Sequence, residues 1–286
     1  MKVVAGIRRQ SENYGSANKQ AVALGIAGSQ LSRILKGDVD GVLSDANWVT
    51  IARKCGVELS DEFHLKTAQT AVFKHIWAQL KFAQENSVSG ILCDRADIGK
   101  THTALMYARE NRHVAYVDCS RSKSKMLLIR AIAKEFGLVN SGRYIDLFDD
   151  LVMLLRSMSA RPLVILDEFG DLHYPAYLEF KALWNATDGR VGWYAMGADG
   201  LAHKLNRQIS NLKVGFAEIF SRLGNKYQRI TPHTEPEFKQ FQKKQIAQIG
   251  LANDCKDVQR LHAKTNMSLR RIPIQLSLER RAENDN

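Results

Sequence analysis

The stretch S-V-S-G-I-L-C-D-R-A-D-I-G-K-T-H-T-A, residues 87–104, decides the fold of this chain. Its first part, residues 88–93, is an apolar run that predicts a buried strand, and Gly99-Lys100-Thr101 then opens a run typical of a helix. A strand, a loop, G-K-T and a helix in this order predict a Walker A loop. In such a loop, backbone N–H groups hold phosphate oxygens, Lys100 neutralises the β- and γ-phosphates, and the Thr101 hydroxyl binds Mg²⁺.

Two carboxylates set this loop apart from the pattern G-x-x-x-x-G-K-[ST]. Asp94 stands where the pattern has its first glycine, and Asp97 lies inside the loop. Both are unfavourable beside a triphosphate unless Arg95 or Mg²⁺ offsets their charge. The loop therefore predicts a nucleotide site and leaves efficient turnover open. The residues expected to contact the nucleotide are Asp94, Arg95, Ala96, Asp97, Ile98, Gly99, Lys100, Thr101, His102 and, further along the chain, Asp167.

The stretch R-P-L-V-I-L-D-E-F-G, residues 161–170, supports this interpretation. Its apolar residues end in Asp167-Glu168, which is the Walker B arrangement. We expect Asp167 to hold Mg²⁺ through water and Glu168 to orient and polarise the attacking water. Taken alone, the same pattern fits a core strand that ends in a solvated acidic turn, but its position after G-K-T favours the nucleotide site.

Strands and helices alternate around these two motifs. The sequence predicts further strands at 113–119, 192–197 and 227–231, and helices at 123–137, 144–157 and 175–186. This alternation predicts an α/β fold with a parallel sheet in a three-layer αβα core, over residues 61–231. Three more helices, at 235–249, 254–264 and 268–282, predict a small helical lid over residues 232–286.

The amino-terminal residues 1–60 read as a separate helical module. In Q-A-V-A-L-G-I-A-G-S-Q-L-S-R-I-L-K-G, residues 20–37, two short helices are expected to flank Gly25, which needs a positive φ. This spacing resembles a helix-turn-helix, and the alternative is a helical adaptor that binds protein. The second helix, from about Gly28 to Lys36, is expected to present Ser29, Gln30, Ser32, Arg33 and Lys36 to phosphates or base edges.

Charge also favours a nucleic-acid partner. Lys and Arg number 41 and Asp and Glu 30, so the net charge is +11, and the excess is spread along the chain. A folded basic protein suggests a polyanionic partner; the alternative is a soluble protein that happens to be basic. In the loop at 120–125, the residues suited to phosphate contacts are Arg121, Lys123 and Lys125, with Lys204, Arg207 and Lys213 as a second set. Either set could instead be a solvated face.

Several classes of protein do not fit the composition. Hydrophobic residues make up 45% and charged residues 25% of the 286, which is typical of a globular protein. No apolar run approaches the roughly 20 residues that a membrane-spanning helix needs. The four cysteines are scattered without a C-x-x-C pair, so we expect no disulfide framework, no zinc finger and a reducing cytoplasm. We expect no metal beyond Mg²⁺.

Taken in order, these motifs resemble the AAA+ ATPases, and within them the MuB-type transposition proteins, the target-DNA activators of phage Mu and related elements. The resemblance covers nearly the whole chain. It rests on the helix-turn-helix, on T-A-V-F-K-H-I-W-A-Q-L-K-F-A at 70–83, on Cys93 with G-K-T, and on L-V-I-L-D-E, V-G-W-Y-A-M-G, E-I-F-S-R-L-G at 218–224 and S-L-R-R-I.

The resemblance implies roles for two arginines. Arg222 matches the arginine finger that reaches the γ-phosphate of a neighbouring subunit, and Arg270 matches the sensor-2 arginine of the lid, with Arg271 as a possible substitute. Each arginine could instead be an ordinary surface or capping residue. Ala198 stands where sensor 1 usually has a polar side chain, and this departure bears on hydrolysis more than on binding.

The resemblance also implies a function. We expect an ATP- and Mg²⁺-dependent, largely sequence-non-specific DNA-binding protein in a bacterial cytoplasm, encoded by a bacterium or a phage. It would oligomerise on duplex DNA as a helical filament, deliver that DNA to a transposase and activate the transposase, without a membrane partner. The alternatives are a nucleotide-bound DNA adaptor that does not hydrolyse ATP, and a helicase loader of the AAA+ type.

Overall fold

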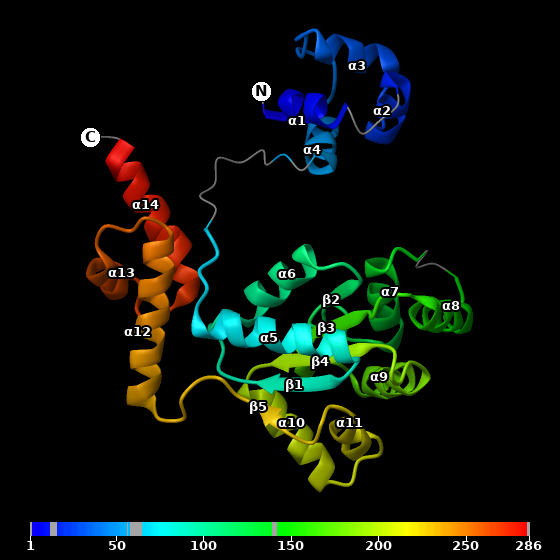
Figure 1. Ribbon diagram of the computed structural model, residues 1–286, viewed down its shortest axis with the longest axis vertical. Coiled ribbons are helices and arrows are strands. Elements are labelled where there is room, and N and C mark those ends of the chain that lie inside the picture. Colours follow the sequence, from blue (N-terminus) through cyan, green and yellow to red (C-terminus); the bar gives the residue numbers. More distant parts are fainter. Residues whose placement is uncertain (1, 12–15, 56, 58–64, 139–141, 285–286) are drawn as a thin grey trace. The chain divides into compact units, whose positions relative to one another are not determined.

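The structure, a computed structural model, describes residues 2–11, 16–55, 57, 65–138 and 142–284 (Figure 1). The chain divides into two compact units, Met1–His64 and Leu65–Asn286. Among the described residues no helix is both long and apolar enough to cross a membrane.

The first unit is helical in its described part. Gly25 has a φ of +78°, as the sequence predicts, and it separates two short helices whose inner faces share one core with the other helices of the unit. The largest fully buried side chains of this core include Ile7, Leu24, Leu31 and Ile34. The helices are α1 (Lys2–Gln10), α2 (Ala17–Leu24), α3 (Gly28–Leu35) and α4 (Asp45–Lys54).

A parallel sheet lies at the centre of the second unit. Its strand order is β2-β3-β4-β1-β5, and every pairing between these described strands is parallel, which confirms the predicted α/β class. Because the strands are parallel, the loops that follow their carboxyl ends meet at one edge of the sheet. The strands are β1 (Ser89–Cys93), β2 (Val114–Asp118), β3 (Leu163–Asp167), β4 (Gly192–Gly197) and β5 (Tyr227–Gln228).

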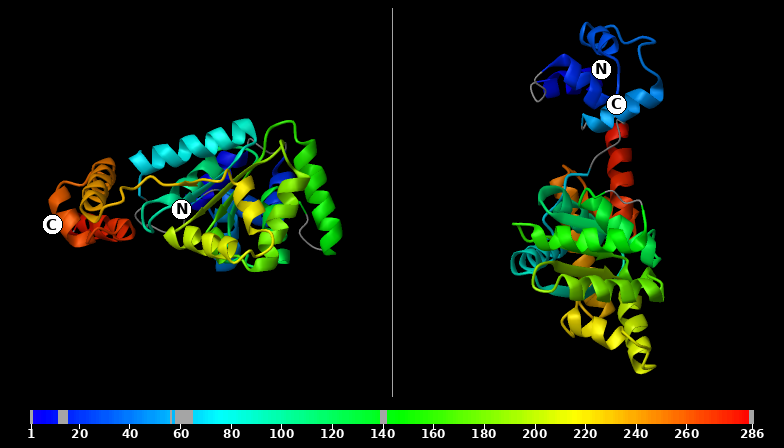
Figure 2. Two further views of the ribbon diagram at one scale, coloured as in Figure 1. Left: turned by 90° about the horizontal axis from the view of Figure 1, so that it is seen from below. Right: turned by 90° about the vertical axis from the view of Figure 1, so that its right-hand side faces the viewer.

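Helices cover both faces of the sheet (Figures 1 and 2). Successive strand residues point to opposite faces, so Val164 packs into one core and Ile165 into the other. The core with Ile165 includes side chains of α5 (Ala71–Asn86) and α6 (Lys100–Glu110). The core with Val164 includes side chains of α7 (Lys125–Glu135), α8 (Tyr144–Ser157), α9 (Tyr174–Ala186), α10 (Asp199–Ser210) and α11 (Phe216–Arg222).

The carboxyl-terminal helices form a group of their own (orange to red in Figure 1). The helix expected at 268–282 is divided, because a short 3-10 turn precedes a regular helix. The elements are α12 (Glu235–Ala252), α13 (Val258–Thr265), η3 (Leu269–Arg271) and α14 (Ile272–Asn284).

Candidate nucleotide site

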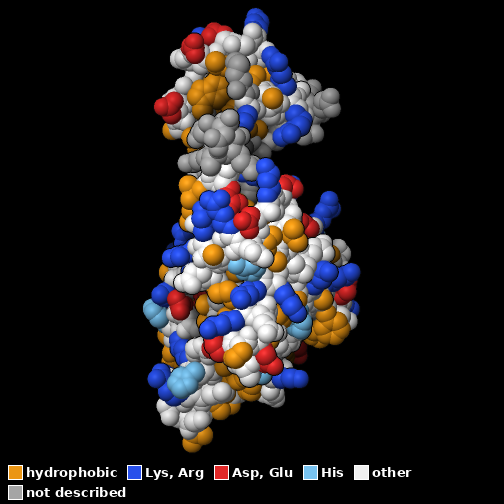
Figure 3. Space-filling model, turned by 90° about the vertical axis from the view of Figure 1, so that its left-hand side faces the viewer, with side chains coloured by type: hydrophobic (Ala, Val, Ile, Leu, Met, Phe, Trp, Pro, Cys, Tyr) orange, Lys and Arg blue, Asp and Glu red, His pale blue; other side chains and the backbone are white. Residues whose placement is uncertain are grey.

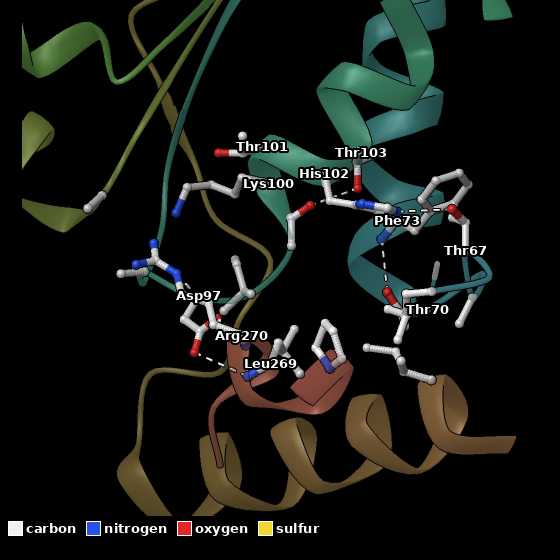
Figure 4. A pocket seen from close by; sticks show the side chains of 18 of the residues that line it. Thr67, Thr70, Phe73, Asp97, Lys100, Thr101, His102, Thr103, Leu269 and Arg270 are labelled. Atoms are coloured by element: carbon white, nitrogen blue, oxygen red, sulfur yellow. Dashed lines mark hydrogen bonds and ion pairs between the residues drawn. The ribbon is translucent and has the colours of Figure 1, made fainter. Parts of the chain in front are cut away.

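A cavity of about 300 Å³ lies where the loop after β1 enters α6. Gly99 caps α6 with a φ of +98°, a conformation that favours glycine. Three parts of the second unit line the cavity: the loop and the start of α6, the segment that leads into α5, and the carboxyl-terminal helices (Figure 4). Of the predicted contact set, the lining residues are Ala96, Asp97, Ile98, Gly99, Lys100, Thr101 and His102.

Lys100 bonds to its own loop. Its Nζ donates to the carbonyl oxygens of Asp94 at 2.9 Å and Arg95 at 2.6 Å. Only 7% of Lys100 is exposed, and burial lowers its pKa, while nearby carboxylates act in the opposite direction. An ammonium group held at a loop in this way is placed to exchange carbonyl partners for phosphate oxygens.

The donor set at the sheet edge fits Mg²⁺. The Thr101 hydroxyl donates to Asp167 Oδ2 at 2.7 Å, so the two expected metal-holding groups lie in contact. The Tyr116 hydroxyl donates to the same oxygen at 2.9 Å. Burial and the Asp167 charge raise the pKa of Tyr116 well above its ordinary value, which keeps this phenol a donor. Oxygen ligands of this kind are those that Mg²⁺ prefers.

Glu168 completes the cavity on the side of the sheet. It lines the cavity, and its φ is +49°, in the left-handed region. Burial raises the pKa of its carboxyl group, and the neighbouring Asp167 charge adds to that shift. A raised pKa makes a carboxylate a better proton acceptor near neutral pH.

The structure corrects the expected position of Asp94. Its carboxylate is fully buried and accepts hydrogen bonds from the backbone N–H groups of Ile230 at 2.7 Å and Thr231 at 2.9 Å, and from the Thr231 hydroxyl. Asp94 does not line the cavity. The predicted direct contact of this side chain with phosphates therefore does not fit the geometry.

Arg95 also lies outside the lining. Its Nη1 contacts Glu235 Oε2 at 2.6 Å, and its guanidinium group lies 4.1 Å from the centroid of the Phe238 ring. The expectation that Arg95 offsets charge at the phosphates is corrected in the same way, because both of its partners belong to α12.

Asp97 lines the cavity but is held by the carboxyl-terminal helices (Figure 4). Its carboxylate accepts from the Ser268 hydroxyl at 2.7 Å and from the backbone N–H groups of Leu269 at 3.1 Å and Arg270 at 3.2 Å. Arg270 also lines the cavity, and its side chain is 81% exposed, with Nε 3.8 Å from Asp97 Oδ1. The structure therefore places the candidate sensor-2 arginine at the site.

The two remaining family positions differ in location. Ala198 follows β4 and lines the cavity. Arg222 does not line it: Nε donates to Asn185 Oδ1 at 2.7 Å, and the guanidinium group lies 5.2 Å from the centroid of the Trp184 ring. A finger that acts on a neighbouring subunit is not required at its own cavity, so the role of Arg222 stays a prediction.

The sequence did not indicate the other wall of the cavity. His102 Nε2 lies 3.0 Å from the Thr67 hydroxyl, and burial lowers the pKa of this imidazole. The segment before α5 carries no motif, and its lining residues become visible only through the fold. The additional lining residues are Leu65, Thr67, Ala68, Thr70, Phe73, Thr103, Ile249, Leu269 and Pro273.

A family model described as an AAA domain matches residues 53–205, which is more than half of the chain. The chain belongs to the AAA domain family. The members of this family are P-loop ATPases, in agreement with the loop, the sheet order and the cavity described above. The comparison with curated proteins gives no match.

Solved structures similar to this AAA domain protein include the following three. The Orc1 protein of Aeropyrum pernix, in complex with DNA, is 17% identical with a TM-score of 0.48, over 65% of this chain and 51% of that chain. Cdc6p of Pyrobaculum aerophilum is 19% identical with a TM-score of 0.48, over 68% of this chain and 52% of that chain. The Aeropyrum pernix ORC2 protein, in ADPNP and ADP complexes, is 16% identical with a TM-score of 0.46, over 68% of this chain and 55% of that chain. The chain spans about half the length of each.

The candidate DNA contacts on α3 differ in availability. Gln30 is occupied within the AAA protein's first unit, because its Oε1 accepts from the Ala27 N–H at 3.0 Å and its Nε2 donates to the Val42 carbonyl at 3.0 Å. Gln30 is therefore corrected from a base-reading residue to a structural one. Arg33 pairs with Asp38 at 2.7 Å, and both Ser29 and Lys36 are exposed.

The basic loop is also partly paired. Lys125 Nζ lies 3.5 Å from Glu179 Oε2 and 3.7 Å from the centroid of the Tyr144 ring, and Lys123 lies 3.5 Å from Asp171. Arg121 is exposed. In the second set, Lys204 donates to the carbonyls of residues 170 and 172. On the face in Figure 3, basic side chains of the described residues lie scattered among acidic and apolar ones.

Proposed function

We propose that this AAA domain protein binds ATP with Mg²⁺ in the cavity at α6 and hydrolyses it. The observation that carries the proposal is the 2.7 Å contact between the Thr101 hydroxyl and Asp167, beside a buried Lys100. Three groups of different chemistry, from the P-loop and from the end of β3, meet there as phosphoryl transfer requires.

Each side chain of the site has its own role toward the nucleotide or Mg²⁺. Lys100 leaves the carbonyls of its own loop and pairs with the β- and γ-phosphates. Thr101 and Asp167 hold Mg²⁺, which when bound neutralises charge on the phosphate oxygens. Glu168 orients the attacking water and accepts its proton, and Arg270 contacts the phosphates from the lid.

We propose further that ATP binding controls assembly of the protein on duplex DNA, for delivery to a transposase that it activates. The motif order, the exposed Ser29 and Lys36 of α3, and the exposed Arg121 support this proposal. The match of Arg222 to the arginine-finger position supports it as well, because a finger that acted on a neighbouring subunit would link ATP to assembly. Electron microscopy with duplex DNA, with and without ATP, tests it: filaments that form only with ATP are expected, and isolated particles under both conditions would contradict it.

Salt dependence tests the mode of DNA binding. Log affinity should fall linearly with log salt, with a slope of about −0.9 per phosphate neutralised. Because Lys123 and Lys125 are paired within the chain, most of the contribution of their loop should come from Arg121. Arg121→Ala should make the slope shallower by about one unit, while the matched change Arg109→Ala should leave it unchanged.

A second candidate is a nucleotide-bound DNA adaptor without turnover. Ala198 favours it, because an apolar side chain lines the cavity where the family usually places a polar one. ATP turnover, measured with and without duplex DNA, separates the two proposals. DNA-stimulated release of phosphate supports the ATPase, and tight ATP binding without any release supports the adaptor.

A further inference from the structure

The P-loop is attached to the carboxyl-terminal helices by the side chains that make it unusual. Asp97 accepts three hydrogen bonds from residues 268–270, at the start of η3 (Figure 4). Binding a phosphate requires none of these contacts. They join the loop to a part of the chain more than 170 residues away in sequence.

Asp94 makes a second attachment, to the residues that lead from β5 into the carboxyl-terminal helices. Its buried carboxylate holds the backbone of residues 230–231, which lie between β5 and the first residue of α12. N–H donors that lose their acceptor away from water are costly to leave unpaired. The segment that leads from the sheet to the lid is therefore fixed at its origin by the P-loop.

Gln242 strengthens the attachment from α12. Its side chain is 2% exposed, and Nε2 donates to the Asp97 carbonyl at 2.9 Å and to the Met267 carbonyl at 3.1 Å. Asp97 also has a φ of +57°, which most residues avoid and which Asp tolerates better than most. Glycine would adopt this backbone conformation without strain. What glycine lacks is the carboxylate that accepts the hydrogen bonds from residues 268–270.

Lys100 connects these attachments to the phosphate site. Its Nζ bonds to the carbonyl oxygens of Asp94 and Arg95, the two loop residues whose side chains hold the segment at 230–231 and α12. A phosphate that drew Lys100 away would release those carbonyls and change the loop at these points. A displacement of the loop would then reach the carboxyl-terminal helices through the side chains that hold them.

We propose that Asp94 and Asp97 are positioning residues that couple the P-loop to the carboxyl-terminal helices, so that nucleotide in the cavity sets the position of the lid. This inference rests on the proposed nucleotide site. The two carboxylates of the loop then transmit a change at the phosphate site to the carboxyl-terminal helices.

Hydrogen–deuterium exchange on the full chain tests the coupling, with and without ATP and Mg²⁺. Without nucleotide, Asp97→Gly should raise exchange at the amides of Leu269 and Arg270 at least about tenfold, because both lose a charged acceptor. With nucleotide, the wild type should change its exchange at residues 230–231 and 268–270. At ATP concentrations that calorimetry shows to saturate each variant, Asp97→Gly should lose that change at 268–270, and Asp97→Asn should restore part of it.

The control is a carboxylate in the lid that does not touch the loop. Asp257 caps α13 by accepting from the Arg260 N–H at 2.9 Å, so Asp257→Ala should loosen α13 and retain the response to nucleotide at 268–270. The coupling would be overturned if Asp97→Gly kept the nucleotide-dependent change in exchange at 268–270. It would also be overturned if the wild-type protein bound ATP without any change in exchange at 230–231 or 268–270. Absence of ATP binding by the wild type in calorimetry would instead overturn the proposed function, and the nucleotide-free exchange would still decide the attachment.

Discussion

The two halves of the P-loop face different parts of the molecule. Gly99, Lys100 and Thr101 line the cavity and agree with the Walker A pattern. Asp94 and Arg95 turn away from it and bind the segment leading to the lid and α12 itself. One short loop therefore makes two kinds of contact through adjacent residues, and a departure from a motif can mark an added contact as well as a lost one.

The largest effect is expected in the half that faces the cavity. Lys100→Ala should weaken ATP binding at least about 100-fold, since it removes charge-assisted hydrogen bonds to two phosphates. Isothermal titration calorimetry measures this. Lys226→Ala, which removes an exposed lysine, is the matched control and should bind as the wild type does. Unchanged affinity in Lys100→Ala would remove this residue from the site and erase the distinction between the halves.

The next effect concerns turnover at the same cavity. Glu168→Gln should slow phosphate release about 100-fold or more and keep ATP binding, because glutamine retains the shape but accepts no proton. The raised pKa of Glu168 means that wild-type turnover should fall as pH drops through a value above the ordinary glutamate pKa. A steady-state pH profile measures this fall in turnover at low pH, and the profile of Glu168→Gln should lack it. Glu110→Gln is the surface control.

For the half that faces the lid, stability is the expected readout. Asp94→Gly should lower the free energy of unfolding by about 3 kcal/mol, because it leaves buried donors at residues 230–231 unpaired. Chemical denaturation measures the loss, and Asp94→Asn should lose less. Tighter ATP binding by Asp94→Gly at unchanged stability would mean that the carboxylate repels phosphates after all.

The smallest effect is expected at Arg95. Arg95→Ala should change ATP affinity by less than about threefold, because the side chain lies outside the cavity and its ion pair with Glu235 is exposed. Titration calorimetry checks this value. Arg95→Lys keeps the charge and loses the planar contact with Phe238, so comparing the two variants separates the ion pair from the stacking. A tenfold loss in both would move Arg95 to the phosphates.

The sequence predicts most of the elements because their signals are local. The strand predicted at 192–197 and the helix predicted at 144–157 have the predicted bounds, since each is a continuous apolar or amphipathic run. The helix expected at 268–282 is divided by a 3-10 turn whose N–H groups bond to Asp97. The sequence predicts that Gln30 faces phosphates or base edges, because no local pattern shows that the Val42 carbonyl accepts a hydrogen bond from its amide.

The sequence by itself determined the strand–loop–helix around G-K-T, the Walker B strand and the AAA domain family, because residue type and spacing over short distances specify these features. Only the tertiary structure decided what Asp94 and Asp97 do. Their hydrogen-bond donors at residues 230–231 and 268–270 lie 136 to 173 residues further along the chain. Hydrogen bonds between such distant groups depend on how the sheet brings its strand ends together and where the following helices pack, and no local pattern records that.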